Sequence, residues 1–267
     1  MSTDDRSREP AATLEMAKSV AIITPNGPGA LNAVDAELSG AVGEALEELD
    51  ADSQLRVGII TGAGRALCAG ADLKALAAGQ PLTAPGRPEW GFAGVVERYI
   101  SKPLIAAVNG FALGGGTEIV LACDLAVVSE ESVLGLPEVK RGLFAAAGGL
   151  IRMPRQVPMK VAMELALTGE PIDPHTAQRW GLVNRVVPAD QVMSSALQLA
   201  QAIAANAPLA VSASKKIIHR ASARDSDWDR DVWRLQDQEL SSILTSDDAK
   251  EGTQAFAQKR KPVWTDS

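Results

Sequence analysis

Hydrophobic residues form five short, unbroken runs in the first two thirds of the chain. The runs cover residues 19–25, 56–62, 102–110, 123–130 and 181–188. Each run is rich in Val, Ile or Leu and is continuous rather than alternating, which is typical of strands that are buried on both faces of a sheet. The pattern therefore predicts five buried strands with connecting segments between them.

Segments with a helical period lie between and after these runs. Residues 33–49 have apolar side chains at intervals of three and four residues, which places them on one face of a helix. Shorter helices, marked by Pro, Asp or Gly at their ends, are predicted over residues 117–122, 158–167 and 173–180. After residue 190 the strand signals stop, and helices are predicted over residues 190–206, 208–224, 228–244 and 247–258.

The chain is therefore predicted to be α/β, with three parts. Residues 1–14 are polar and acidic, and we expect them to form a disordered extension. Residues 15–200 hold the α/β core, and residues 201–267 form a helical C-terminal region. Within the core, residues 79–92 are rich in Pro and Gly and have no period, so they are predicted to be a long loop. No sequence repeat of fixed period is visible.

The size, charge and cysteine content of the chain argue against several classes of function. A chain of 267 residues that is 46% hydrophobic can bury a sizeable core. Its net charge of −7, without a basic run interleaved with aromatic residues, argues against nucleic acid as a partner. Two cysteines, Cys68 and Cys123, are too few for a disulfide framework and are expected to be buried thiols. Without an apolar stretch of membrane length or a signal peptide, we expect a cytoplasmic protein with no membrane partner.

A glycine triplet is the first candidate for chemistry. Gly114, Gly115 and Gly116 precede Glu118 and an apolar run. Bare backbone N–H groups at the start of a helix suit an anion or a developing oxyanion. The alternative is close helix packing, with Glu118 as a favourable first-turn acid.

Two further segments are candidates for a binding or catalytic site. Residues 61–74 follow a strand and mimic part of a dinucleotide fingerprint, but the third glycine position holds Leu67, so this match is weak. A tight glycine-lined turn at residues 69–71 remains. Glu138 lies 20 residues after Glu118, and two such carboxylates near one pocket could divide acid and base work. The alternative is a solvated pair of Glu138 with Lys140 or Arg141.

Taken together and in order, these segments resemble the crotonase superfamily, also called the enoyl-CoA hydratase/isomerase family. The resemblance covers nearly the whole chain. Its motifs are GPGALNAV (27–34), CAGADLK (68–74), KPLIAAVNGFALGGGTE (102–118), LPEVKRGLFAAAGG (136–149), LTGEPIDPHTAQRWGLVNRVVP (167–188) and DDAKEGTQAFAQKRKP (247–262). It implies a spiral of ββα turns followed by C-terminal helices that mediate trimers, which often pair into hexamers.

The resemblance also implies a site for acyl-CoA thioesters. Matching of motifs assigns two oxyanion-hole N–H groups to Ala71 and Gly115, and two catalytic carboxylates to Glu118 and Glu138. In family hydratases such a pair holds one water molecule; Glu118 would activate it for attack on C3 and Glu138 would protonate C2. No metal or organic cofactor is implied, because CoA is part of the substrate.

CoA itself would contact two regions of the chain. Matched positions for CoA and substrate binding are Ala69, Gly70, Asp72, Leu73, Lys74 and Gly114 in the glycine-lined turns, and Phe256 and Lys259 near the C-terminus. Lys259 matches a family lysine that reaches the CoA phosphates, with the residue supplied by a neighbouring subunit. Phe256 would line the acyl end.

Several alternatives stay open at this point. Residues 143–147, LFAAA, depart from the Pro-Gly or Pro-Asp that many hydratases have there, so the acyl length and the reaction outcome are not fixed. Hydration of a trans-2-enoyl-CoA is the leading hypothesis, because both glutamates are present. A double-bond isomerase of the same family and a non-catalytic acyl-CoA-binding protein are the rivals.

Overall fold

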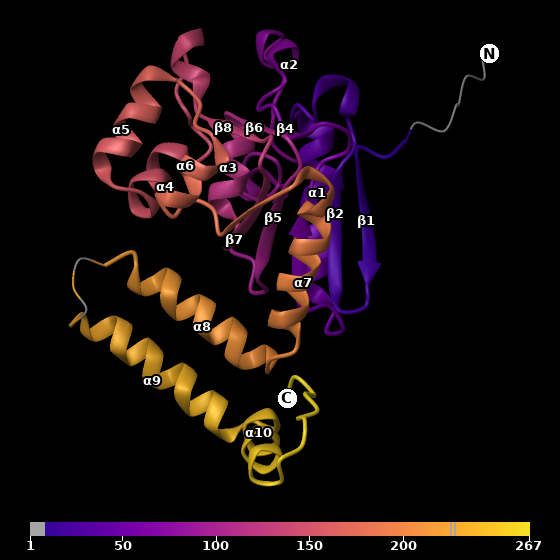
Figure 1. The fold of residues 1–267 in the computed structure, drawn as a ribbon, viewed down its shortest axis with the longest axis vertical. Helices are drawn as coiled ribbons and strands as arrows, with labels where there is room; N and C mark the ends of the chain where they lie inside the picture. Colours follow the sequence, from indigo (N-terminus) through magenta and orange to yellow (C-terminus); the bar gives the residue numbers. More distant parts are fainter. Residues whose placement is uncertain (1–8, 225, 227) are drawn as a thin grey trace.

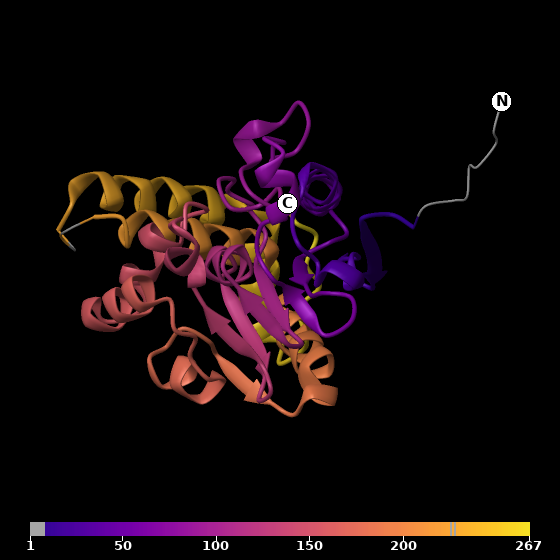
Figure 2. The ribbon, with the colours of Figure 1, turned by 90° about the horizontal axis from the view of Figure 1, so that it is seen from above.

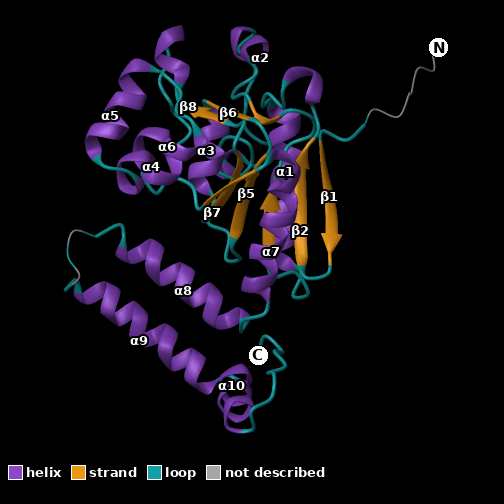
Figure 3. Cartoon of the chain, viewed as in Figure 1, coloured by secondary structure: helices purple, strands orange, loops and turns teal. Residues whose placement is uncertain are grey.

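Two sheets, a mixed one of six strands and a parallel one of three, form the centre of the molecule (Figure 1, Figure 3). The computed structural model describes residues 9–224, 226 and 228–267. The large sheet has the order β1 (Ala12–Ala17), β2 (Val20–Pro25), β3 (Val57–Ile60), β5 (Leu104–Val108), β7 (Leu125–Ser129) and β9 (Arg185–Val187). The small sheet has the order β4 (Ala66–Cys68), β6 (Phe111–Leu113) and β8 (Val133–Gly135).

The five predicted strands are present, and four of them are buried as expected, whereas the fifth, β9 at the edge of the sheet, is half-buried. They form β2, β3, β5, β7 and β9, which are neighbours in the large sheet and pair in parallel. The sixth strand, β1, pairs antiparallel with β2 through a tight turn that contains Lys18 at φ 59°. Residues 12–14, which were expected to belong to the disordered extension, are instead the first residues of β1. Residues 1–8 lie outside the described part of the chain.

Successive strands alternate between the two sheets. β3, β5 and β7 lie in the large sheet, and the strand that follows each of them, β4, β6 or β8, lies in the small sheet. A helical segment then leads to the next turn. This arrangement is the spiral of ββα turns that the sequence resemblance implied, and it places the ends of β4 and β6 side by side.

Ten α-helices are assigned within the described residues. Those around the sheets are α1 (Ala36–Ala51), α2 (Leu73–Ala77), α3 (Gly115–Ala122), α4 (Gly149–Gln156), α5 (Met159–Thr168), α6 (Pro174–Arg179) and α7 (Val192–Ala204). Those beyond the core are α8 (Pro208–Ala221), α9 (Arg230–Thr245) and α10 (Asp247–Ala257). Short 3₁₀ turns cover Pro28–Ala30, Pro88–Trp90, Pro137–Arg141 and Ala189–Gln191. The predicted helices are present with shifts of a few residues at their ends, whereas α4 was not predicted.

The continuous apolar runs follow from burial of both faces of the large sheet. In β3, Ile60 faces a cluster that includes Leu46 of α1, while Ile59 faces a second cluster that includes Ala196 of α7. Since successive side chains of a strand point to opposite faces, a sheet covered on both sides requires apolar residues at every position.

Helices α8 to α10 form an arm that extends from the core (Figure 1), and α8 and α9 run side by side (Figure 2). The half-buried carboxylate of Asp124 ties α8 to the core: it contacts Lys215 Nζ at 2.7 Å and His219 Nε2 at 2.9 Å, and accepts a hydrogen bond from the Leu104 amide at 2.7 Å. Burial alone would raise the pKa of Asp124, but these contacts more than offset burial, and the pKa lies below its usual value.

Large apolar side chains are exposed along this arm. Ile218 is 66% exposed, Leu244 is 65% exposed and Phe256 is 87% exposed. Trimerisation through these helices stays a prediction.

No single helix among the described residues is long and apolar enough to cross a membrane. Helices α7 and α8 meet the length and composition criteria for a span only as a pair, which is bent by 105°.

Candidate active site

A cavity of about 390 Å³ lies where the glycine-rich turns after β4 and β6 face the Pro137–Arg141 turn. Its lining includes eight of the residues predicted for the site: Ala69, Gly70, Ala71, Leu73, Gly114, Gly115, Glu118 and Glu138. These positions are spread over 70 residues of the sequence. The spiral brings them together because β4 and β6 are adjacent strands of the small sheet.

Two backbone N–H groups in this cavity are close together and free. A Cβ atom on Gly70, which has φ +102°, would lie 3.4 Å from the Gly115 nitrogen, so the two turns touch. The amides on either side of Ala71 are used: Ala69 donates to Leu31 O at 3.0 Å and Asp72 donates to Val34 O at 2.9 Å. Within the described residues, no acceptor is present for the amides of Ala71 and Gly115. Both can donate to one substrate oxygen.

At each glycine of the triplet, an added Cβ atom would come too close to a neighbouring group. Gly114 has φ +57°, and its Cβ atom would lie 2.8 Å from Glu138 Oε1. A Cβ on Gly115 would come within 2.3 Å of the Phe92 ring, and a Cβ on Gly116 within 2.0 Å of the Cys68 carbonyl oxygen. The two explanations considered for the triplet, bare amides and close packing, are therefore both present in the structure.

Glu118 projects from the first turn of α3 and is 3% exposed. Its Oε1 accepts a hydrogen bond of 2.8 Å from the amide of Gly149, the first residue of α4. Burial raises the pKa of Glu118 to about 7; the hydrogen bond from Gly149 opposes this rise, and the charge of Glu138 adds to it. The carboxyl group is therefore able to exchange a proton near neutral pH.

Glu138 is half-buried in the Pro137–Arg141 turn. Its Oε1 lies beside Gly114, and its Oε2 is buried without a hydrogen-bond partner among the described residues. Burial raises the pKa of Glu138, although the charge of Arg141 lowers it in part. The alternative of a solvated pair with Lys140 is wrong, since Lys140 Nζ binds Glu170 Oε1 at 2.6 Å. An unpaired buried carboxylate oxygen is costly unless a ligand or water satisfies it.

Four predicted binding residues lie outside the lining of this cavity. Asp72 caps α2, where its Oδ1 accepts hydrogen bonds from the Lys74 and Ala75 amides at 2.8 and 3.1 Å. Lys74 is exposed on the same helix. Phe256 and Lys259 are exposed at the end of the arm. Contact of these two with the site of a neighbouring subunit stays a prediction.

Comparison with known proteins identifies the family. The sequence pattern of the family described as enoyl-CoA hydratase/isomerase matches residues 15–267. The chain belongs to this family. The crotonase fold predicted from the sequence is likewise confirmed, because solved structures of family members superpose on it with high scores.

Three relatives show how similar this family member is to known proteins. A carnitinyl-CoA dehydratase of Salmonella paratyphi A is 44% identical over 91% of this chain and 93% of its own length. The crystal structure of an enoyl-CoA hydratase from Mycobacterium tuberculosis H37Rv has a TM-score of 0.91 and 45% identity, over 97% of this chain and all of its own. A carnitinyl-CoA hydratase from Mycobacterium avium has a TM-score of 0.78 and 50% identity over the same shares.

Sequence reasoning missed several residues of this enoyl-CoA hydratase/isomerase family member that shape the cavity. Gly149 holds Glu118, and a Cβ at Gly149 would lie 3.0 Å from Glu118 Oε1. Arg141 lines the cavity beside Glu138. Phe92, at the end of the 79–92 loop that was expected to shape the acyl pocket, does pack against Gly115 and line the cavity. The Gly148-Gly149 pair was the available signal for a close approach, although it did not reveal which side chain approaches.

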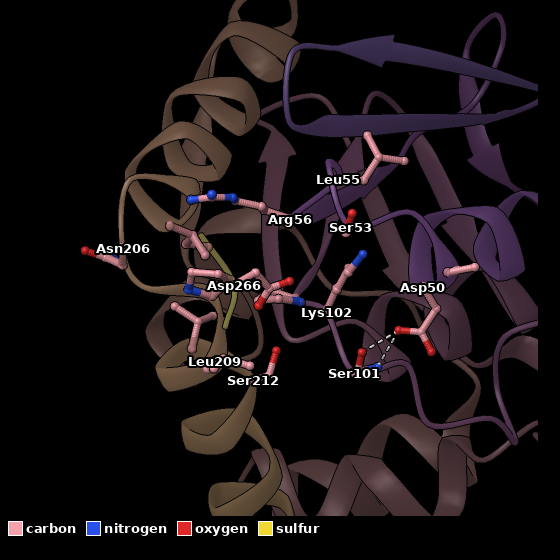
Figure 4. A pocket seen from close by; sticks show the side chains of 15 residues that line it. Asp50, Ser53, Leu55, Arg56, Ser101, Lys102, Asn206, Leu209, Ser212 and Asp266 are labelled. Atoms are coloured by element: carbon pink, nitrogen blue, oxygen red, sulfur yellow. Dashed lines mark hydrogen bonds between the residues drawn. The ribbon is translucent and has the colours of Figure 1, made fainter. Parts of the chain in front are cut away.

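A second cavity, of about 330 Å³, lies between the core and the arm (Figure 4). Three of its polar side chains, those of Arg56, Lys102 and Asp50, make structural contacts. Arg56 donates to the carbonyl groups of Ala204 and Trp264 at 3.1 and 3.4 Å, and Lys102 donates to carbonyls at the end of α1. Asp50 accepts hydrogen bonds from Ser101 (Figure 4). These contacts hold the arm and the C-terminal segment on the core.

The raised pKa of Glu118 predicts a pH-dependent stability. The folded state holds this proton more tightly than the unfolded chain does, so the free energy of unfolding falls as pH rises from the unfolded pKa of 4.5 to above about 7. The expected loss is up to roughly 3 kcal/mol, at 1.36 kcal/mol per pKa unit. Glu118→Gln removes this dependence while retaining an acceptor oxygen for Gly149.

Urea denaturation of the wild type and Glu118→Gln at about pH 5 and pH 8 measures the difference. We expect the variant to become more stable relative to the wild type at the higher pH. Exposed Glu170→Gln serves as the control and is expected to follow the wild type. If the free energies of unfolding of the wild type and Glu118→Gln change with pH in the same way, then Glu118 ionises as it does in water and the prediction is wrong.

Proposed function

We propose that this protein is a hydro-lyase that adds water reversibly across the C2=C3 bond of a trans-2-enoyl-CoA thioester. One observation carries the proposal: two carboxylates with raised pKa values, Glu118 and Glu138, share a cavity with two unpaired backbone amides. The names of the relatives, which include hydratases and dehydratases, agree with this class of reaction.

The proposed reaction begins at the thioester carbonyl. The amides of Ala71 and Gly115 donate hydrogen bonds to the carbonyl oxygen, which withdraws electrons from C3 and stabilises the enolate that forms. Removal of a single donor of this kind from an enzyme costs on the order of 10²–10³ in kcat. Because the turn at Gly70 and the start of α3 fix both amides before substrate binds, no reorganisation is needed at the moment of reaction.

The two carboxyl groups divide the proton transfers. Ionised Glu118 takes a proton from water while the water oxygen bonds to C3; the π electrons of C2=C3 move toward the thioester oxygen. Protonated Glu138 then delivers its proton to C2 as the enolate collapses. The raised pKa of Glu138 favours the protonated donor, and a pKa near 7 leaves a large fraction of Glu118 ionised at neutral pH. One water molecule is consumed, and proton exchange between the carboxyl groups restores both.

The acyl group falls into one of two chemical classes. A neutral hydrocarbon chain would suit the apolar part of the lining, which includes Leu73, Leu82 and Phe144. The relatives named for carnitinyl-CoA point instead to an acyl group with a trimethylammonium cation at C4. Both classes undergo the same addition of water.

Turnover of enoyl-CoA thioesters of graded chain length in oxygen-18 water tests this proposal. We expect loss of the conjugated-thioester absorbance and one labelled oxygen in a 3-hydroxyacyl-CoA product. A shifted double bond with proton exchange at C2 and no labelled oxygen would assign the protein as an isomerase instead. Tight binding without turnover of any thioester would assign it as an acyl-CoA-binding protein.

A further inference from the structure

One cation in the cavity has no partner in the protein. Arg141 ends the Pro137–Arg141 turn and lines the cavity together with Glu118 and Glu138. Among the described residues, neither an ion pair nor a hydrogen bond engages its guanidinium. The neighbouring cation, Lys140, is by contrast bound to Glu170 at 2.6 Å. Arg141 is therefore free to act on whatever occupies the cavity.

The position of Arg141 is at the reacting end of the bound thioester. Its charge acts on the carboxyl group of Glu138, so the two side chains lie near one another. In the proposed reaction Glu138 protonates C2, and the CoA phosphates are separated from C2 by the whole pantetheine arm. Because Arg141 and Glu138 line the same cavity, the guanidinium would act more strongly on the acyl group than on the phosphates.

The carboxylates in the lining only partly balance this cation. Glu118 has a pKa of about 7 and the pKa of Glu138 is raised, so the pair does not hold two full negative charges at neutral pH. A guanidinium stays charged throughout this range. Arg141 and the apolar residues Leu73, Leu76 and Leu143 line the cavity but are exposed, so solvent screens the charge of Arg141 in part.

We infer that Arg141 makes this cavity select acyl groups by charge, accepting neutral acyl chains and disfavouring those with a fixed cation at C4. The inference rests on the proposed function and specifies its substrate class. Cages of aromatic rings hold quaternary ammonium groups in proteins; among the residues that line this cavity the aromatic ones are Phe92 and Phe144, and Phe144 is 64% exposed. An ammonium at C4, one carbon from the reacting bond, would share the cavity with the guanidinium, and like charges at short range repel even where solvent screens them in part.

The test compares trans-2-butenoyl-CoA with its 4-trimethylammonio derivative. We expect the wild type to favour the neutral thioester at least about tenfold in kcat/KM, which corresponds to about 1.4 kcal/mol. Arg141→Leu is expected to reduce this ratio by about the same factor, mainly through the KM of the cationic thioester. Arg141→Glu should reduce the ratio further, and Arg141→Lys should retain the preference.

Lys140→Leu is the matched control, because it removes an adjacent charge that is paired outside the cavity lining. It is expected to leave the ratio unchanged. The inference is overturned if the wild type turns over the two thioesters with equal kcat/KM. It is also overturned if the Arg141 variants change kcat/KM for both thioesters by the same factor.

Binding separates failure of this inference from failure of the proposed function. If the wild type turns over none of the enoyl-CoA thioesters of graded chain length, the proposed function fails. Calorimetric titration with the saturated analogues, butanoyl-CoA and 4-trimethylammoniobutanoyl-CoA, still measures charge selection. Tighter binding of the neutral analogue, lost in Arg141→Leu, would support the inference; equal binding would overturn it.

Discussion

Replacement of Glu118 by Gln is expected to lower the kcat for enoyl-CoA hydration by roughly 10²–10⁴-fold, the usual contribution of a general base. Gln keeps the size of the side chain and an oxygen that can accept the hydrogen bond from Gly149, so the fold of α3 and α4 should persist. The amide cannot take a proton from water. Because the oxyanion donors are untouched, the affinity for a saturated acyl-CoA should change little.

Glu138→Gln is expected to cause a loss of similar size for a different reason. The variant retains the shape beside Gly114 but cannot deliver a proton to C2. Glu170→Gln, which changes an exposed acid that pairs with Lys140 outside the cavity lining, is the control for both. Steady-state kinetics and calorimetric binding together separate catalysis from binding. Near wild-type turnover in either active-site variant would contradict the division of proton transfers between the two glutamates.

Gly114→Ala is expected to lower kcat by about 10²-fold or more. The new methyl group would lie 2.8 Å from Glu138 Oε1 and would force that carboxyl group, or the adjacent amide of Gly115, to move. Displacement of an oxyanion donor alone costs on the order of 10²–10³ in kcat. The residue also has φ +57° and ψ −123°, outside the left-handed α region, so alanine there adds backbone strain of about 1–3 kcal/mol.

Gly142→Ala separates strain from displacement. Gly142 has φ +72°, but its added Cβ would have no neighbour within 4 Å among the atoms of the structure's described residues. Gly142 is in the left-handed α region, with ψ 19°, so alanine there adds strain of about 1–2 kcal/mol while the geometry of the cavity is preserved. Kinetics and urea denaturation of both variants are compared. Equal losses of kcat in Gly114→Ala and Gly142→Ala would mean that the side-chain position at residue 114 does not matter for catalysis.

The large sheet could be predicted from the sequence because both of its faces are covered. Ile59 and Ile60 point into different apolar clusters, and such pairs produce the continuous runs. The small sheet could not be predicted in this way, since each of its strands has three residues, too few to establish a period. The structural repeat is also hidden, because its first strands begin at unequal intervals, at residues 57, 104 and 125.

The candidate site was predictable to the extent that its residues lie in local motifs. The glycine triplet and Glu118 are close in sequence, and Glu138 follows a recognisable Leu-Pro pair. The contact from Gly149 to Glu118 joins residues 31 apart, and α4 begins with glycine and contains Pro154, both of which disfavour a helix by propensity. Packing against α3 overrides that propensity, and only the folded chain shows it.

A crystal structure of the protein with a bound, unreactive acyl-CoA tests the geometry of the proposed site most directly. We expect the thioester oxygen to lie about 3 Å from the amide nitrogens of both Ala71 and Gly115, with the carboxyl groups of Glu118 and Glu138 beside C2 and C3. A thioester oxygen that points to solvent, or that contacts neither amide while the acyl chain fills the cavity, would contradict the account.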